Sequence, residues 1–170
     1  QITFEDNYLE KAKEVIDASI EKFWDKKDGG FFYSEDRYLS TEKPIFDFSS
    51  PAGNSVAANI LLDLFHLAEK TDYKETAEKI LKFFHALSPR DSLQKATYLQ
   101  ALEYYFTGPK EFVIIGDKKD PEVKAFLEII ERKSGNIIIH IGETNSGKRI
   151  FKDRAKMNGK PTVYMCYKNT

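Results

Sequence analysis

One polar stretch of the sequence gathers the side chains best suited to chemistry. In IFDFSSPAGNSVAANILLDL, Asp47 stands upstream of Asn54 and Ser55, with two further serines between them. Carboxylate, amide and hydroxyl groups in this arrangement can satisfy the free amides at the start of a helix, or they can hold the hydroxyls of a ligand. The stretch is therefore either an elaborate helix cap or the polar floor of a binding site.

Aromatic residues in the segment WDKKDGGFFY could complete such a site for a sugar. Trp24 and Phe32 supply ring faces for the C–H face of a sugar, while carboxylates and amides hydrogen-bond to its hydroxyls. Asp47 is then the candidate catalytic residue, and Trp24, Phe32, Asn54 and Ser55 are the candidate substrate-binding residues. The alternative for Trp24, the one tryptophan of the chain, is an anchor in the hydrophobic core.

A glycosidase needs two carboxyl groups at a defined separation. The other acidic residues near this stretch are Asp25, Asp28, Glu35 and Asp36. The sequence does not give the distances between them, and carboxylates in loops are usually solvated. Asp47 is therefore the one acidic residue that we assign to catalysis.

A second motif, in NIIIHIGETNSGKRI, resembles the phosphate-binding loop of nucleotide hydrolases. Gly142 to Lys148 fit the pattern G-x-x-x-x-G-K after an apolar run. A working loop also needs Ser or Thr after the lysine, a following helix, and later strands that carry an acidic metal ligand. Arg149 takes the place of the hydroxyl residue, and one strand remains before the sequence ends. We interpret this motif as a solvated loop.

The histidines and the cysteine do not indicate a metal site. His66, His85 and His140 share no spacing of four residues and have no cysteine partner. We expect neither a metal nor another cofactor. Cys166 lies in a mostly apolar segment, where a packed thiol is the default. A single free thiol fits the reducing cytoplasm, which is the expected location.

The composition is that of a folded globular protein. The 170 residues are 41% hydrophobic and 31% charged, with 26 Lys and Arg against 27 Asp and Glu. A net charge of −1 excludes a global attraction to nucleic acid or to anionic lipid, so we expect neither as a partner, although a local basic patch stays open. No apolar run is long enough for a membrane span.

Hydrophobic periodicity predicts four helices in the first 108 residues. They cover about 8–24, 51–69, 73–87 and 92–106, and Asn7 is the expected cap of the first helix. The expected inward residues include Ile60, Leu64 and Phe84. The segment DKKDGGFFYSED breaks the first helix, with Gly29-Gly30 supplying backbone freedom, and 34–50 is expected to be an irregular loop.

The pattern changes after Gly108-Pro109, which ends the fourth helix. EFVIIGD and NIIIHIG are expected strands on either side of an amphipathic helix that opens at Asp120-Pro121. This order predicts a parallel βαβ element, and PTVYMCYKN adds a final strand. We therefore expect two domains, a helical-hairpin domain over 1–108 and a small α/β element over 109–170.

Four segments, in order, resemble the C-terminal portion of the YyaL/spermatogenesis-associated-protein family. They are YLEKAKEVIDASIEKFWDKKDGGFFY, the stretch from Asp47 to Ser55, GPKEFVIIGDKKDP and GKPTVYMCYKN. The resemblance implies a thioredoxin-like domain followed by an (α/α) toroid of six helical hairpins, similar to six-hairpin glycosidases and N-acylglucosamine 2-epimerases. The family pattern has Ser where this chain has Ala52. A second cysteine that is common near the end of the family pattern does not follow Cys166.

The resemblance leaves two hypotheses for the function. In the first, the intact protein binds or acts on a carbohydrate, as a glycosidase or a sugar epimerase. In the second, the toroid is a non-catalytic scaffold beside a redox-active thioredoxin-like domain. A closed toroid needs about twelve helices, so the resemblance also implies an upstream part of the same polypeptide. We therefore expect an inactive fragment with exposed apolar surface, able to self-associate.

Overall fold

A computed structural model describes residues 4–36, 38–87, 93–144 and 146–167. The chain divides into a helical unit, Glu5–Phe106, and an α/β unit, which comprises Thr107–Thr170 together with Gln1–Phe4. The chain is mainly helical and ends in a small mixed sheet, as expected from the sequence. The assignment of 1–108 and 109–170 to separate domains stays a prediction, as does the toroid.

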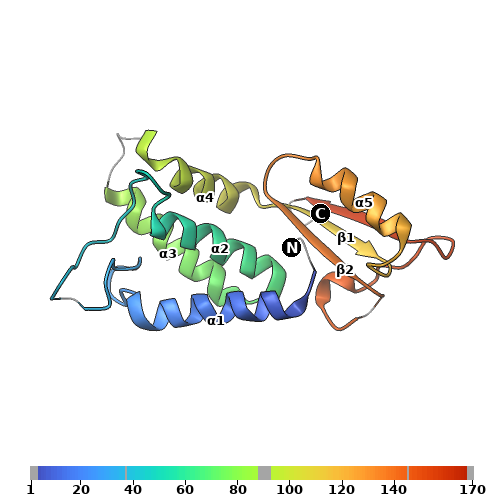
Figure 1. Cartoon of the computed structure of the whole chain (residues 1–170), viewed down its shortest axis with the longest axis horizontal. Coiled ribbons are helices and arrows are strands. Elements are labelled where there is room, and N and C mark those ends of the chain that lie inside the picture. The colour runs from blue at the N-terminus through green and yellow to red at the C-terminus, as the bar shows by residue number, and fades with distance from the viewer. Residues whose placement is uncertain (1–3, 37, 88–92, 145, 168–170) are drawn as a thin grey trace. The chain divides into compact units, whose positions relative to one another are not determined.

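The helical unit begins with a long helix, continues through an irregular loop, and ends in three further helices (Figure 1). Contacts are most extensive between α2 and α3, which form a helical hairpin, and α1 also contacts α2. The elements are α1 (Asp6–Phe23), α2 (Gly53–Ala68), α3 (Thr71–Leu87), the 3-10 helix η1 (Leu93–Lys95) and α4 (Ala96–Thr107).

The core of the helical unit follows the predicted apolar stripes with one exception. Ala77, Ile80 and Phe84 on α3 are buried, as their spacing predicts. Ile60 on α2 is 40% exposed, so its predicted inward position is wrong. α2 is apolar over most of its circumference, and the pattern therefore does not fix which side chains point outward.

The start of α1 also differs from the prediction. Asn7 lies inside the helix, whose N-cap is Glu5, and no side chain caps it. The acidic first-turn residue Asp6 still favours the start, because its charge complements the helix dipole. The end at Phe23 is within one residue of the predicted end. In the turn that follows, Gly29 and Gly30 have φ values of +79° and +80°, which only glycine adopts at low cost.

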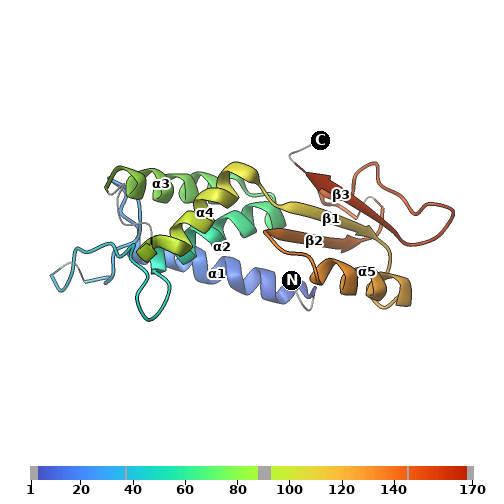
Figure 2. The ribbon, with the colours of Figure 1, turned by 90° about the horizontal axis from the view of Figure 1, so that it is seen from above.

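The α/β unit contains the predicted parallel pair. β1 (Lys110–Ile115) and β2 (Ile137–Gly142) are parallel and are joined through α5 (Pro121–Glu131). β3 (Thr162–Tyr167) pairs antiparallel with β1, so the strand order is β2-β1-β3 (Figure 2). The Asp120 carboxylate accepts a hydrogen bond from the Glu122 amide and caps α5 at Pro121, as the sequence predicts.

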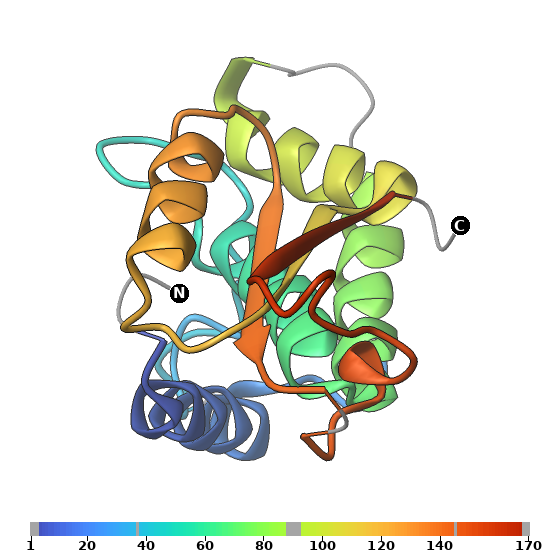
Figure 3. The ribbon, with the colours of Figure 1, turned by 90° about the vertical axis from the view of Figure 1, so that its right-hand side faces the viewer.

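The two faces of the sheet are covered differently. Helix α5 packs on one face, against Phe112, Ile114 and Ile139. On the other face, Phe151 from the 3-10 helix η2 (Arg149–Phe151) packs against Val113 and Ile115. Figure 3 shows α5 and η2 on opposite sides of the strands.

Some sequence predictions fall outside the described residues. These are the start of the fourth helix at residue 92, residue 145 of the glycine-rich motif, and the last two residues of the strand predicted over PTVYMCYKN. In the described part of the chain, no helix is long and apolar enough to cross a membrane.

Candidate functional site

The loop between α1 and α2 is held by side chains that the sequence analysis assigned to a binding site. It begins with a tight turn, in which the Asp25 amide donates to the Gly30 carbonyl at 2.9 Å and the Gly29 amide donates to the Asp25 carbonyl at 3.0 Å. Trp24 and Phe31 then form an isolated antiparallel bridge. The turn reverses the chain and directs the following residues back along the end of α1.

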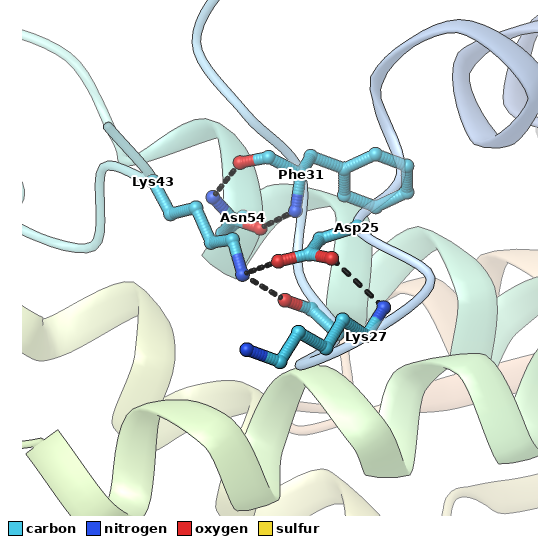
Figure 4. Close-up of polar contacts among 6 residues, drawn as sticks. Asp25, Lys27, Phe31, Lys43 and Asn54 are labelled. Atoms are coloured by element: carbon cyan, nitrogen blue, oxygen red, sulfur yellow. Dashed lines mark hydrogen bonds and ion pairs between the residues drawn. The ribbon is translucent and has the colours of Figure 1, made fainter. Parts of the chain in front are cut away.

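An ion pair joins this turn to a later part of the loop. The Lys43 ammonium lies 2.5 Å from the Asp25 carboxylate and also donates to the Gly29 carbonyl at 2.7 Å (Figure 4). The side chains are only 9% (Lys43) and 14% (Asp25) exposed. The ammonium also lies 4.0 Å from the centre of the Phe83 ring, within range of a cation–π interaction.

The pKa of Asp25 is lowered from its ordinary value. The hydrogen bond from Lys43 is the main cause, and the backbone amides of Lys27 and Asp28 add to it against the opposing effect of burial. Asp25 is therefore an ionised structural residue. A general acid needs the opposite shift.

Asn54 secures the same loop from the first turn of α2. Its Oδ1 atom accepts the Phe31 amide at 2.6 Å, and its Nδ2 group donates to the carbonyls of Phe31 at 2.9 Å and Pro44 at 3.0 Å. Asn54 is 2% exposed. Its amide group is thus engaged with the backbone of the chain itself, as Figure 4 shows for Phe31.

Asp47 bridges the starts of two helices. One carboxylate oxygen accepts the Ala52 amide and the other accepts the Thr97 amide, both at 2.8 Å. Ala52 is the N-cap residue of α2, and Thr97 lies in the first turn of α4. Burial opposes the charge, but these two amides and the Thr97 hydroxyl outweigh it, and the pKa of Asp47 is lowered.

The other predicted site residues have different surroundings. Ser55 is 1% exposed, and its hydroxyl has no hydrogen-bond partner within the described part of the chain. The Trp24 ring is half-buried and packs edge-on against Phe31, with 5.1 Å between ring centres. Phe32 is half-buried, with the Lys43 ammonium 5.0 Å from its ring centre.

The structure thus brings part of the predicted set together. Asn54 and Lys43 both lie against Gly30, where an added Cβ would stand 3.4 Å from the Asn54 Oδ1 atom and 3.5 Å from Lys43 Cδ. Asp47 holds the N-termini of α2 and α4 instead. Asp28, Glu35 and Asp36 are exposed, as expected for loop carboxylates. The roles assigned to Asp47, Trp24, Phe32, Asn54 and Ser55 in catalysis and substrate binding stay predictions.

Two features carried no signal in the sequence. Lys43 is nearly buried, whereas lysine is usually exposed, and only its position opposite Asp25 explains this. Asp63 on α2 accepts a hydrogen bond from the Tyr104 hydroxyl at 2.9 Å. Burial raises the pKa of Asp63, and the hydrogen bond from Tyr104 and the proximity of His66 offset this only in part.

Among the described residues, no three or more His, Cys, Asp or Glu side chains come together in a way that could hold a metal ion. The glycine-rich motif leads into η2, a 3-10 helix of three residues. This single turn does not provide the aligned amides of the long helix that follows a phosphate-binding loop.

Comparison with known proteins identifies relatives of greater length. The chain is 28% identical over 168 residues to the uncharacterized protein B0495.5 of Caenorhabditis elegans, a match that covers 95% of this chain and 23% of that protein. It is 30% identical over 131 residues to spermatogenesis-associated protein 20 of Rattus norvegicus, covering 74% of this chain and 16% of that protein. The human protein of the same name is 28% identical over 131 residues.

The chain is therefore a distant homologue of these proteins and spans less than a quarter of their length. No family model and no solved structure matches it.

The buried ion pair gives a prediction for stability. Replacement Lys43→Met should lower the free energy of unfolding by on the order of 3 kcal/mol, because the carboxylate of Asp25 is left without its charged partner. Adding Asp25→Asn should recover part of this loss, with a coupling free energy of about 1–3 kcal/mol. Urea denaturation of the two single variants and the double variant measures it.

A matched pair on the surface provides the control. Lys22 and Glu35 are 3.9 Å apart and 54% and 62% exposed. The replacements Lys22→Met and Glu35→Gln should show a coupling below about 1 kcal/mol. Equal coupling in the two cycles would contradict a structural role for the Asp25–Lys43 pair.

Proposed function

We propose that this distant homologue of spermatogenesis-associated protein 20 is a non-catalytic helical scaffold, in which the polar turn before α2 is a structural clamp. The observation that carries the proposal is the position of Asp47. Its two carboxylate oxygens accept hydrogen bonds from backbone amides at the starts of α2 and α4. The α4 donor, Thr97, is 50 residues from Asp47 in the sequence.

The hydrogen bonds of Asn54 support the same conclusion. A residue that binds a sugar must leave donors or acceptors for the ligand, because the ligand's hydroxyls compete with water for them. Asn54 instead uses its amide on three backbone groups of the loop, and Ser55 lies beneath the surface. Asn54 is therefore placed to hold the loop to α2.

The proposal predicts that Asp47→Asn lowers stability. An asparagine presents one amide NH₂ toward a backbone N–H, so one of the two hydrogen bonds is lost, at a cost of about 1–3 kcal/mol. Asp28→Asn, at an exposed position in the same loop region, is the control and should change stability by less than about 0.5 kcal/mol. Urea denaturation at neutral pH measures both.

The pH dependence adds a second readout. The pKa of Asp47 is lower in the folded state than its ordinary value of 3.8. The ionised carboxylate therefore contributes fully to the free energy of unfolding above pH 3.8, and this contribution is lost as the pH falls through the pKa of the folded state. The difference in stability between the wild type and Asp47→Asn should therefore shrink below about pH 4. A variant as stable as the wild type would contradict the clamp and favour a catalytic role.

Carbohydrate binding is the second candidate, and the exposure of aromatic side chains favours it. Tyr33, Tyr38 and Phe48 in the loop between α1 and α2 are 73%, 102% and 80% exposed. Exposed rings are suited to stacking on sugars, and Trp24 and Phe32 are partly accessible nearby in the sequence. In this candidate the intact protein is a sugar-binding protein or a sugar-active enzyme.

Trp24 can distinguish the two candidates because it is the only tryptophan. Under the scaffold proposal, titration with a panel of mono- and disaccharides should leave its fluorescence without a saturable change. Quenching by acrylamide provides the control that the half-buried ring senses solutes. A saturable change that Phe32→Ala abolishes would favour carbohydrate binding and contradict the scaffold.

We also propose that the helical unit is part of a larger helical array, such as an (α/α) toroid. The relatives are more than four times as long as the matched region, and apolar side chains on the helices are exposed. They are Tyr8 and Val15 on α1 at 57% and 68%, and Leu99 and Phe106 on α4 at 44% and 74%. In a longer polypeptide, neighbouring helices would cover these side chains.

This arrangement predicts self-association of the isolated chain. Light scattering should show a mass that rises with concentration, and Tyr8→Lys with Val15→Lys should reduce it by removing apolar surface. Lys11→Gln, at an exposed polar position on the same helix, is the control. A monomer at all concentrations would count against the larger array.

A further inference from the structure

The net charge of −1 conceals two units of opposite charge. The helical unit, residues 5–106, has 13 Lys and Arg against 19 Asp and Glu. The α/β unit has 13 Lys and Arg against 8 Asp and Glu. An attraction to polyanions, which the composition of the whole chain excludes, is therefore available locally to the α/β unit.

The fold gathers much of this positive charge at one edge of the sheet. The carboxyl ends of the parallel strands β1 and β2 lie at the same edge, and the antiparallel β3 begins there (Figure 2). The Gly116 amide donates to the Gly142 carbonyl at 3.0 Å, and a Cβ at Gly116 would lie 3.2 Å from Pro161. The loops 116–120 and 143–161 therefore begin side by side, at the carboxyl ends of β1 and β2.

These two loops contain eight basic residues and four acidic ones. We call the eight the basic edge. Seven of them are exposed and one, Arg154, is half-buried and donates to the Ile150 carbonyl and to the Cys166 sulfur. Lys156 forms an ion pair with Glu143 at 3.1 Å. The basic edge consists of Lys118, Lys119, Lys148, Arg149, Lys152, Arg154, Lys156 and Lys160.

The local geometry disfavours a small phosphate ligand. The N-terminus of α5 lies at this edge, but Asp120 caps it and Glu122 adds a second negative charge in the first turn. The other helix nearby, η2, has only three residues. The lysines also lie along exposed loops, so the arrangement suits an extended anion in which the charge is repeated.

We propose that the basic edge binds the phosphodiester backbone of nucleic acid without sequence preference. Exposed lysines act as point charges toward phosphates and release counterions, which drives sequence-independent binding. A protein partner fits less well, because protein interfaces are depleted in lysine. A membrane surface fits less well because Met157 is the only large apolar side chain that is exposed in the described parts of these loops.

Fluorescence anisotropy with a labelled DNA duplex of mixed sequence, about 20 base pairs long, tests this proposal on the full chain. Binding should be present at 50 mM salt. With three phosphate contacts or more, the dissociation constant should rise roughly 40-fold or more between 50 and 200 mM salt. Absence of binding at 50 mM salt would overturn the proposal.

Two charge-matched variants locate the surface. The edge variant carries Lys118→Glu, Lys152→Glu and Lys160→Glu, and it should lose binding at 50 mM salt. The control variant carries Lys110→Glu, Arg132→Glu and Lys133→Glu, three exposed positions at the start of β1 and directly after α5, at the opposite end of the strands from the basic edge. It has the same net charge and should bind far more tightly than the edge variant.

Three results would overturn the proposal. Equal weakening in both variants would show that net charge alone governs binding. Binding to vesicles of phosphatidylcholine and phosphatidylserine, with no binding to the duplex, would assign the edge to membranes. Retained binding by an edge variant with glutamines in place of the three lysines would show that these side chains are not the contacts. Circular dichroism of each variant verifies the fold.

Discussion

The hydrogen bonds of Asn54 are the constraint on which the helical unit depends. The loop between α1 and α2 passes over buried residues, so its backbone amides and carbonyls need partners other than water. One side-chain amide satisfies both polar groups of Phe31 and the carbonyl of Pro44, from the first turn of α2. Because an unsatisfied buried group costs about 1–3 kcal/mol, this residue fixes the loop at Phe31 and at Pro44.

The charged residues around the loop follow the same logic. Lys43 is nearly removed from water, which is tolerable because its ammonium has the Asp25 carboxylate, the Gly29 carbonyl and the Phe83 ring as partners. Asp47 satisfies backbone amides at the starts of α2 and α4, as Lys43 satisfies a backbone carbonyl in the turn. Residues that look like catalytic groups in the sequence therefore stabilise an irregular connection, and their lowered carboxyl pKa values follow from that role.

The α/β unit is organised by different forces. Its strands need no such clamps, because β1 finds a hydrogen-bonded neighbour on each side and its side chains alternate between two apolar faces. The polar residues are consequently free to collect in the loops at one edge. Polar groups in the loop of the helical unit are thus engaged with the chain itself, whereas most basic side chains of the α/β unit's loops are exposed to solvent.

The sequence by itself determined the helices, the βαβ order, the glycine turn after α1 and the homology to longer proteins. These depend on local periodicity, on glycine and proline, and on ordered segments that can be read along the chain. It did not determine the outward position of Ile60, the start of α1 before Asn7, or the pairing of Lys43 with Asp25. Only the tertiary structure shows that Asp47 and Asn54 hydrogen-bond to the backbone, because their partners at Thr97 and Phe31 are distant in sequence and become neighbours only when the helices pack.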